Sequence, residues 1–146
     1  MTPKWFELAV AEIGTKEAPG YANNPIVQQY YKDAGSGQLP DSVPWCAAFV
    51  GAMLKRAGVA PSGFLAARSY LKWGVPIKTP VKGAIVVFSR GTSWQGHVAF
   101  FDSYVRTGTI KVVGGNQSDA VNYGNYSLAK LLGYRWPLGV NFPGGR

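Results

Sequence analysis

A cysteine and a histidine are the residues of this sequence whose types suit nucleophilic catalysis. The chain has one of each among its 146 residues, Cys46 and His97. Pro44 lies two residues before Cys46, and proline is tolerated in the first turn of a helix, so we expect Cys46 in or just after such a turn. The positive end of a helix favours a thiolate, and its free N–H groups can hold the oxyanion of an attacked carbonyl. A small, buried and inert cysteine is the alternative at the same position.

His97 follows Gly96 and opens an apolar run, which predicts a histidine at the start of a β-strand. An imidazole in that place can accept a thiol proton at neutral pH. The alternative is a histidine of the surface, or one satisfied within the core.

The expected pairing of two strands supplies a third residue. If Thr107-Gly108 is a two-residue hairpin turn, His97 faces Ser118, and Asn116 is its diagonal neighbour within about 7–8 Å. The amide oxygen of Asn116 can then accept a hydrogen bond from one imidazole nitrogen and fix the tautomer that receives the thiol proton. A register change of one residue would turn Asn116 away, and a plain turn is the alternative here.

The elements that must position these residues are helices first and strands afterwards. Apolar spacing, caps and glycine stops predict helices over about 3–13, 25–34, 44–57 and 64–73. Short β-branched and aromatic runs predict strands over 84–89, 97–105 and 109–113, with weaker ones over 123–126 and 132–136. This order predicts one α+β domain over 1–146, with N-terminal helices packed on a C-terminal antiparallel sheet.

Composition and charge exclude several classes of protein. The net charge of +8 suits a polyanionic partner, whether nucleic acid, a membrane surface or an anionic cell wall. One Cys and one His are too few for the usual zinc sites, so we expect no metal. Residues 1–14 lack the apolar core of a signal peptide, and no run approaches the ~18 apolar residues of a membrane span. We therefore expect synthesis in the cytoplasm without a signal peptide, and no stable membrane insertion.

Three segments of the chain together resemble a known family of cell-wall hydrolases. They resemble the CHAP (cysteine, histidine-dependent amidohydrolase/peptidase) family and its NlpC-type relatives, which are papain-like enzymes. The order of Cys, His and a polar residue matches from about Trp5 to Trp136. The segments are 44–50 (PWCAAFV), 96–99 (GHVA) and 114–118 (GGNQS).

The resemblance implies a papain-like α+β fold with Cys46 as nucleophile, His97 as base and Asn116 as the orienting residue. It implies that the substrate and partner is peptidoglycan, cut at an amide bond either as a stem-peptide endopeptidase or as an N-acetylmuramoyl-L-alanine amidase. We expect a monomer that needs no cofactor and binds no nucleic acid.

The chain departs from the family pattern in three ways. NlpC-type members often use a second His as the third residue, and this chain has none, so Asn116 must serve. Papain-like peptidases place a Gln shortly before the Cys, where this sequence offers Asp41, with Gln38 further off. The acidic calcium-binding loops of some CHAP lysins are missing.

Aromatic residues are candidates for a substrate cleft. We expect Trp45, Trp94 and Tyr123 to bind substrate, the alternative being that they build the core and its rim.

Other functions remain open at this point. A muramidase would need a catalytic carboxylate, for which Glu7, Glu12 and Glu17 are candidates. A non-catalytic, basic cell-wall-binding module would use the charge alone, and a protein deamidase or transglutaminase would share the cysteine chemistry. The expected setting is a phage endolysin released through a holin-permeabilised membrane to act on the cell wall or in the periplasm. A machine-delivered antibacterial toxin or a virion lysin is the alternative.

Overall fold

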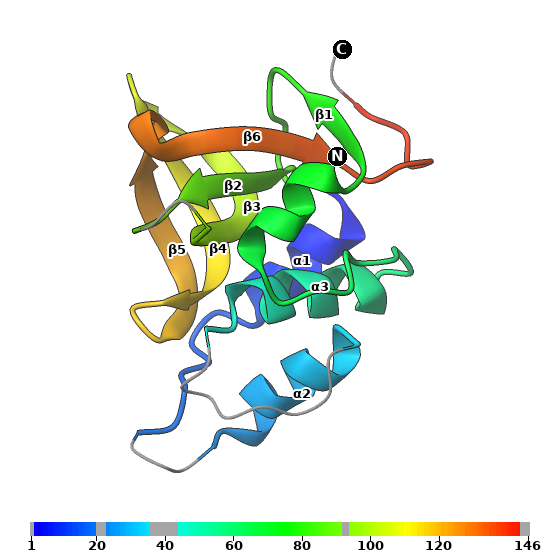
Figure 1. Ribbon diagram of the computed structural model, residues 1–146, viewed down its shortest axis with the longest axis vertical. Helices are drawn as coiled ribbons and strands as arrows, with labels where there is room; N and C mark the ends of the chain where they lie inside the picture. Colours follow the sequence, from blue (N-terminus) through cyan, green and yellow to red (C-terminus); the bar gives the residue numbers. More distant parts are fainter. Residues whose placement is uncertain (1, 20–22, 36–43, 92–93, 144–146) are drawn as a thin grey trace.

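Helices precede a twisted antiparallel sheet in the computed structural model, which describes residues 2–19, 23–35, 44–91 and 94–143 (Figure 1). The helices are α1 (Lys4–Ala11), α2 (Pro25–Asp33) and α3 (Cys46–Arg56), with two 3-10 helices, η1 (Ala67–Lys72) and η2 (Leu128–Lys130). The strands are β1 (Val75–Ile77), β2 (Ile85–Ser89), β3 (Gly96–Arg106), β4 (Thr109–Gln117), β5 (Ala120–Ser127) and β6 (Leu131–Trp136).

The sheet has the strand order β1-β6-β2-β3-β4-β5, and each neighbouring pair is antiparallel. Strands β2 to β5 follow one another as a meander, while β6 returns to lie between β1 and β2. The expected α+β fold, with helices on one antiparallel sheet, is confirmed.

Helix α3 is the central element of the helical layer. Its residues from Cys46 to Leu54 are all buried, as expected for a helix that is apolar on every side. One side of α3 packs on β3 and β4, and its other sides pack on α1 and α2 (Figure 1). A Cβ on Gly51 would lie 2.9 Å from the Cβ of Ala34, so glycine permits the close approach of the segment that ends α2.

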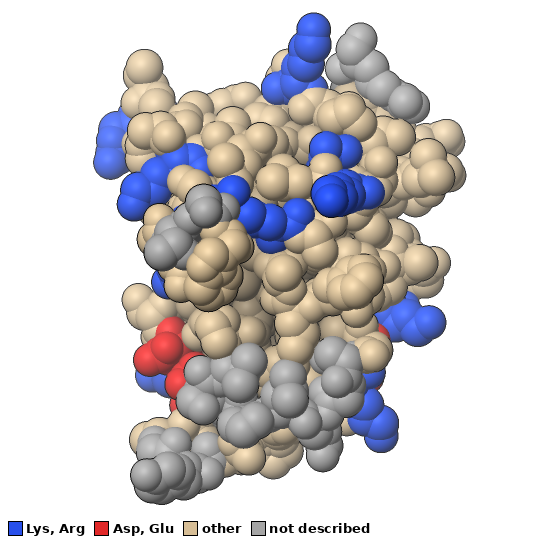
Figure 2. Space-filling model, viewed as in Figure 1, with Lys and Arg blue, Asp and Glu red and all other residues tan. Residues whose placement is uncertain are grey.

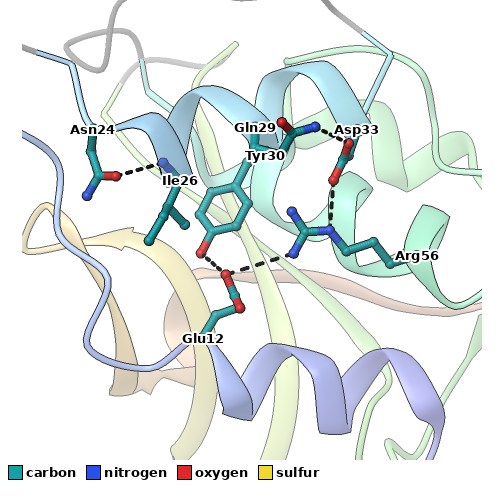
Figure 3. Close-up of polar contacts among 7 residues, drawn as sticks. All are labelled: Glu12, Asn24, Ile26, Gln29, Tyr30, Asp33 and Arg56. Carbon is teal, nitrogen blue, oxygen red and sulfur yellow. Dashed lines mark hydrogen bonds and ion pairs between the residues drawn. The ribbon is translucent and has the colours of Figure 1, made fainter.

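A polar network joins the three helices (Figure 3). The hydroxyl of Tyr30 on α2 donates to Glu12 at the end of α1 over 2.7 Å. The Nε of Arg56, at the end of α3, donates to the Oδ2 of Asp33 over 2.8 Å. The guanidinium of Arg56 also pairs with Glu12, with 3.8 Å between its terminal nitrogen and the Glu12 Oε1. The Tyr30 ring also packs against Phe49 of α3, so one side chain of α2 contacts both other helices.

Two elements differ from the expected ones. The predicted fourth helix is the shorter 3-10 helix η1, and β1 was not predicted. None of the described helices is both long enough and apolar enough to cross a membrane.

Candidate active site

Cys46 is the first residue of α3, and Trp45 is the residue that caps the helix. Cys46 is 4% exposed, and the backbone N–H of Val98 donates to its sulfur. Val98 directly follows His97 in β3, so the packing of α3 on β3 brings the thiol to the backbone beside the histidine. Asp41 and Gln38, the residues suggested for the oxyanion, lie outside the described residues.

Burial sets the protonation of Cys46. Removal from water raises the pKa of the thiol, and the N–H of Val98 and the charge of Arg90 lower it without offsetting that rise. We expected the start of the helix to favour a thiolate. That expectation is wrong for the resting protein, because the sulfur at this helix end is shielded from water.

His97 lies on β3, where it pairs with Phe88 of β2. Its ring stacks on Tyr126 of β5 with centroids 5.2 Å apart, and its side chain is 3% exposed. Burial lowers the pKa of His97 to about 4, and the hydrogen bond with Gln117 opposes this shift only in part. The imidazole is therefore neutral at physiological pH and available as a base.

A glutamine holds one edge of this ring. The Oε1 of Gln117 lies 2.9 Å from the Nε2 of His97. The Nε2 of Gln117 donates to the backbone carbonyl of Asn122 and to its Oδ1, each over 2.9 Å. The Nδ2 of Asn122 in turn donates to the Gln117 carbonyl over 2.8 Å.

This network fixes the tautomer of His97. A backbone carbonyl can only accept, so the Gln117 nitrogen must face Asn122 and the Gln117 oxygen must face His97. The Nε2 of His97 therefore carries the proton, and its Nδ1 has a free lone pair. Nδ1 is buried and has no hydrogen-bond partner within the described part of the chain.

The pairing of β3 with β4 departs from the regular hairpin that we expected. The turn lies at Thr107-Gly108 as expected, with Arg106 paired to Thr109. Two irregularities in β3, between Tyr104 and Arg106 and between Phe101 and Ser103, then shift the register so that Phe100 pairs with Val113. The expected pairing of His97 with Ser118 assumed a regular ladder and is wrong. Continued without a further break, the shifted register would set His97 opposite Asn116, so the contact with Gln117 depends on the distortion of β4 itself.

Asn116 departs from the strand as well. Its φ of 57° is left-handed, and the β4–β5 ladder is irregular between Gly114 and Gln117. The hydrogen bond to His97 that we expected of Asn116 is made by Gln117.

A cavity of about 560 Å³ opens beside the cysteine. Cys46, Asn116 and the highly exposed Trp94 line it, together with Arg90 and Gln95. Segment 65–67, at the start of η1, also lines it.

Two of the three aromatic residues expected in the cleft lie elsewhere. Trp45 is fully buried, stacks on Tyr30 and donates to Glu17 over 2.9 Å, because its ring faces the helical core. Tyr123 does not line this cavity, and the ammonium of Lys111 lies 5.4 Å from its ring centroid. Trp94 alone of the three lines the cavity that contains Cys46.

No group of three or more His, Cys, Asp or Glu that could hold a metal ion occurs among the residues that the structure describes. The site thus presents a neutral thiol, a neutral imidazole with one free nitrogen, and an adjoining cavity.

A family model described as CHAP domain matches residues 38–116, more than half of the chain. The match contains Cys46, His97 and Asn116, and it ends one residue before Gln117. No curated protein matches the chain.

Proposed function

The chain belongs to the CHAP domain family of peptidoglycan amidases and peptidases, and we propose that it cleaves a peptidoglycan amide with Cys46 as nucleophile and His97 as base. The observation that carries this proposal is the free lone pair of His97 Nδ1, a buried atom with no hydrogen-bond partner among the described residues. Val98, the residue after His97, contacts the Cys46 sulfur through its backbone. A buried polar atom without a partner is rare and calls for an explanation, and proton transfer from the thiol supplies one.

The reaction begins from a neutral pair. His97 Nδ1 takes the Cys46 proton as the sulfur attacks the carbonyl carbon, so the ion pair forms only when substrate is present. The protonated Nδ1 then gives this proton to the leaving amine, and the acyl group stays on sulfur as a thioester. Water, deprotonated by the same Nδ1, hydrolyses the thioester and restores the thiol.

The residues around this pair divide into two roles. Gln117 is a positioning residue, because it accepts the hydrogen bond of the His97 Nε2–H and does not line the cavity that contains Cys46. Asn116 and Trp94 line the cavity with Cys46, so we place them in contact with substrate. The first N–H groups of α3 supply donors for the oxyanion.

Two finer points are which peptidoglycan amide is cut and in which biological setting the enzyme acts. We propose a stem-peptide endopeptidase in preference to an N-acetylmuramoyl-L-alanine amidase, because NlpC-like enzymes commonly cut within the stem peptide. We propose the setting of a phage endolysin, by analogy of fold and site, and a delivered toxin or virion lysin would use the same chemistry.

Two glutamates weaken the muramidase alternative. Glu12 accepts from Tyr30 and Glu17 accepts from Trp45, and neither lines the cavity that contains Cys46. These carboxylates connect the N-terminal segment to the helical core.

The decisive experiment identifies the bond. Purified peptidoglycan is digested, new amino groups and new reducing ends are assayed, and the fragments are identified by mass spectrometry. We expect new amines without new reducing ends, because the thioester route releases an amine.

Variants assign this activity to the site. Cys46→Ala is expected to abolish amine release, whereas Glu7→Gln, a change at an exposed glutamate of α1, is expected to retain it. Reducing ends formed with intact stem peptides, or digestion that persists in Cys46→Ala, would refute the cysteine mechanism.

A further inference from the structure

Arg90 stands out among the residues that line the active-site cavity. It directly follows β2, is exposed, and lines the same cavity as Cys46. Its guanidinium makes no hydrogen bond or ion pair with any residue that the structure describes. Arg68 does not line this cavity, and its Nε donates to the Gln95 carbonyl over 2.7 Å.

The charge of Arg90 reaches the reacting groups. It lowers the pKa of both Cys46 and His97, so its guanidinium lies within electrostatic range of the pair. None of the described residues that line this cavity is acidic, so no carboxylate of the protein neutralises Arg90 there.

The surroundings extend this positive character. Arg68 and Lys72 line a second cavity of about 490 Å³, and its lining residues Phe64 and Arg68 flank segment 65–67 in the sequence. Figure 2 shows Lys and Arg side chains gathered over the upper half of this view, with few acidic side chains visible, at the margins. An anionic substrate is therefore drawn to the face that holds the cavity.

We propose that Arg90 binds a free carboxylate of the substrate next to the scissile amide, so that the enzyme selects acidic peptides over their amidated forms. The inference rests on the proposed function and names the substrate class of that site. A guanidinium presents parallel N–H donors that match both oxygens of a carboxylate, and it stays charged throughout the working pH range. A carboxamide offers one acceptor and no charge, so it loses most of this interaction.

The test compares two muropeptides that differ in one group. Both carry the cleaved amide, and the residue next to it bears either a free carboxylate or the corresponding carboxamide. The value of kcat/KM is measured for each with the wild type, Arg90→Gln, Arg90→Lys and Arg106→Gln. Arg106 is exposed at the end of β3 and does not line the cavity. Arg106→Gln therefore removes one positive charge from another part of the surface.

We expect the wild type to prefer the acid, and Arg90→Gln to reduce this preference by about tenfold or more, the value of one charge-assisted hydrogen bond. Arg90→Lys keeps the charge without the planar donors and should retain part of the preference, while Arg106→Gln should retain all of it. The readout is the ratio of kcat/KM for the acid to kcat/KM for the amide. Loss of the Arg90 charge also changes the pKa of Cys46 and of His97, but that effect is common to both substrates and cancels in the ratio.

Two results would overturn the carboxylate site and leave the cysteine hydrolase standing, provided that Cys46→Ala is inactive. One is a wild type that cleaves acid and amide equally well. The other is an Arg90→Gln variant that loses the same factor on both. Cleavage that persists in Cys46→Ala would overturn the proposed function and this inference with it.

Discussion

At the scale of single residues, His97 has a neutral partner where a carboxylate would supply a negative charge. Gln117 fixes the proton on Nε2, but it offers only an amide dipole to the imidazolium that forms during the reaction. Burial lowers the pKa of His97 to about 4 and raises that of Cys46, so both groups favour the uncharged state in the free protein. The thiolate–imidazolium pair must therefore be stabilised by bound substrate and by the start of α3.

Substitutions of Gln117 test its positioning role. Gln117→Ala is expected to lower kcat by about 10- to 100-fold with little change in KM, because the histidine loses its orientation. Gln117→Glu keeps an acceptor and adds a negative charge, which raises the pKa of His97. Neutral His97 is the active base, so the acid limb of kcat/KM against pH, near pH 4 in the wild type, should move to higher pH in Gln117→Glu.

The control for this prediction is the neighbouring residue. Asn116→Gly suits the left-handed φ of 57° and removes the side chain that lines the cavity. It should raise KM and leave the acid limb in place. The reverse pattern, with the acid limb moved by Asn116→Gly and unmoved by Gln117→Glu, would return the orienting role to Asn116.

At the scale of elements, the end of β4 passes close beneath the start of α3. A Cβ on Gly115 would lie 2.7 Å from the Cβ of Phe49 and 2.8 Å from the Trp45 ring. This contact sets the distance between the strand that carries Asn116 and Gln117 and the helix that carries the nucleophile. Glycine at position 115 is thus required by space, and its φ is not left-handed.

Gly115→Ala should separate these two elements. We expect a loss of about 1–3 kcal/mol in the free energy of unfolding, as for overpacked cores, together with lower activity. Gly133→Ala is the matched control, because its Cβ would have its nearest contact at 3.5 Å, with Leu71 Cδ2. Denaturant unfolding of the two variants measures the difference, and equal stability of both would show that the strand yields without cost.

The catalytic pair could be predicted from the sequence, whereas the residue at the end of β4 that contacts His97 could not. Cys46 and His97 were identifiable because their residue types and flanking glycine or proline indicate a helix start and a strand start. Gln117 was not, because its contact depends on the β3 irregularities and on left-handed residues near the end of β4, at Asn116 and Ser118. The alternative of a plain turn at Gly114–Asn116 does not hold, because the chain continues to Gln117 as a distorted strand. Each bulge moves every later side chain by one position, and the apolar pattern of the sequence does not mark where a bulge occurs.

At the scale of the whole molecule, the buried neutral histidine links folding to pH. His97 has a pKa of about 4 when folded and 6.5 as its ordinary value, so between these pH values the unfolded chain binds a proton that the folded chain excludes. The contribution of His97 to the free energy of unfolding is therefore fully present above pH 6.5, and it is lost as the pH falls toward 4. The difference between the two pKa values corresponds to a loss of at most about 3.4 kcal/mol in the free energy of unfolding.

Carboxylates act in a separate window. The pKa of Asp33 and of Asp102 is lowered, because hydrogen bonds and ion pairs with neighbours outweigh burial. Their contribution is present above the ordinary Asp value of 3.8 and is lost as the pH falls through the folded values. The slope between pH 6.5 and about 4.5 thus belongs mainly to His97.

Denaturant unfolding from pH 7 to pH 4 measures this slope. We expect the wild type to lose stability through that range at up to about 1.4 kcal/mol per pH unit, the value for one proton. His97→Gln removes the titrating group and should flatten the curve above pH 4.5, even where its stability at pH 7 is lower. A wild-type curve that is level from pH 7 to pH 4.5, or a His97→Gln curve with the wild-type slope, would mean that another group carries the acid sensitivity of the fold.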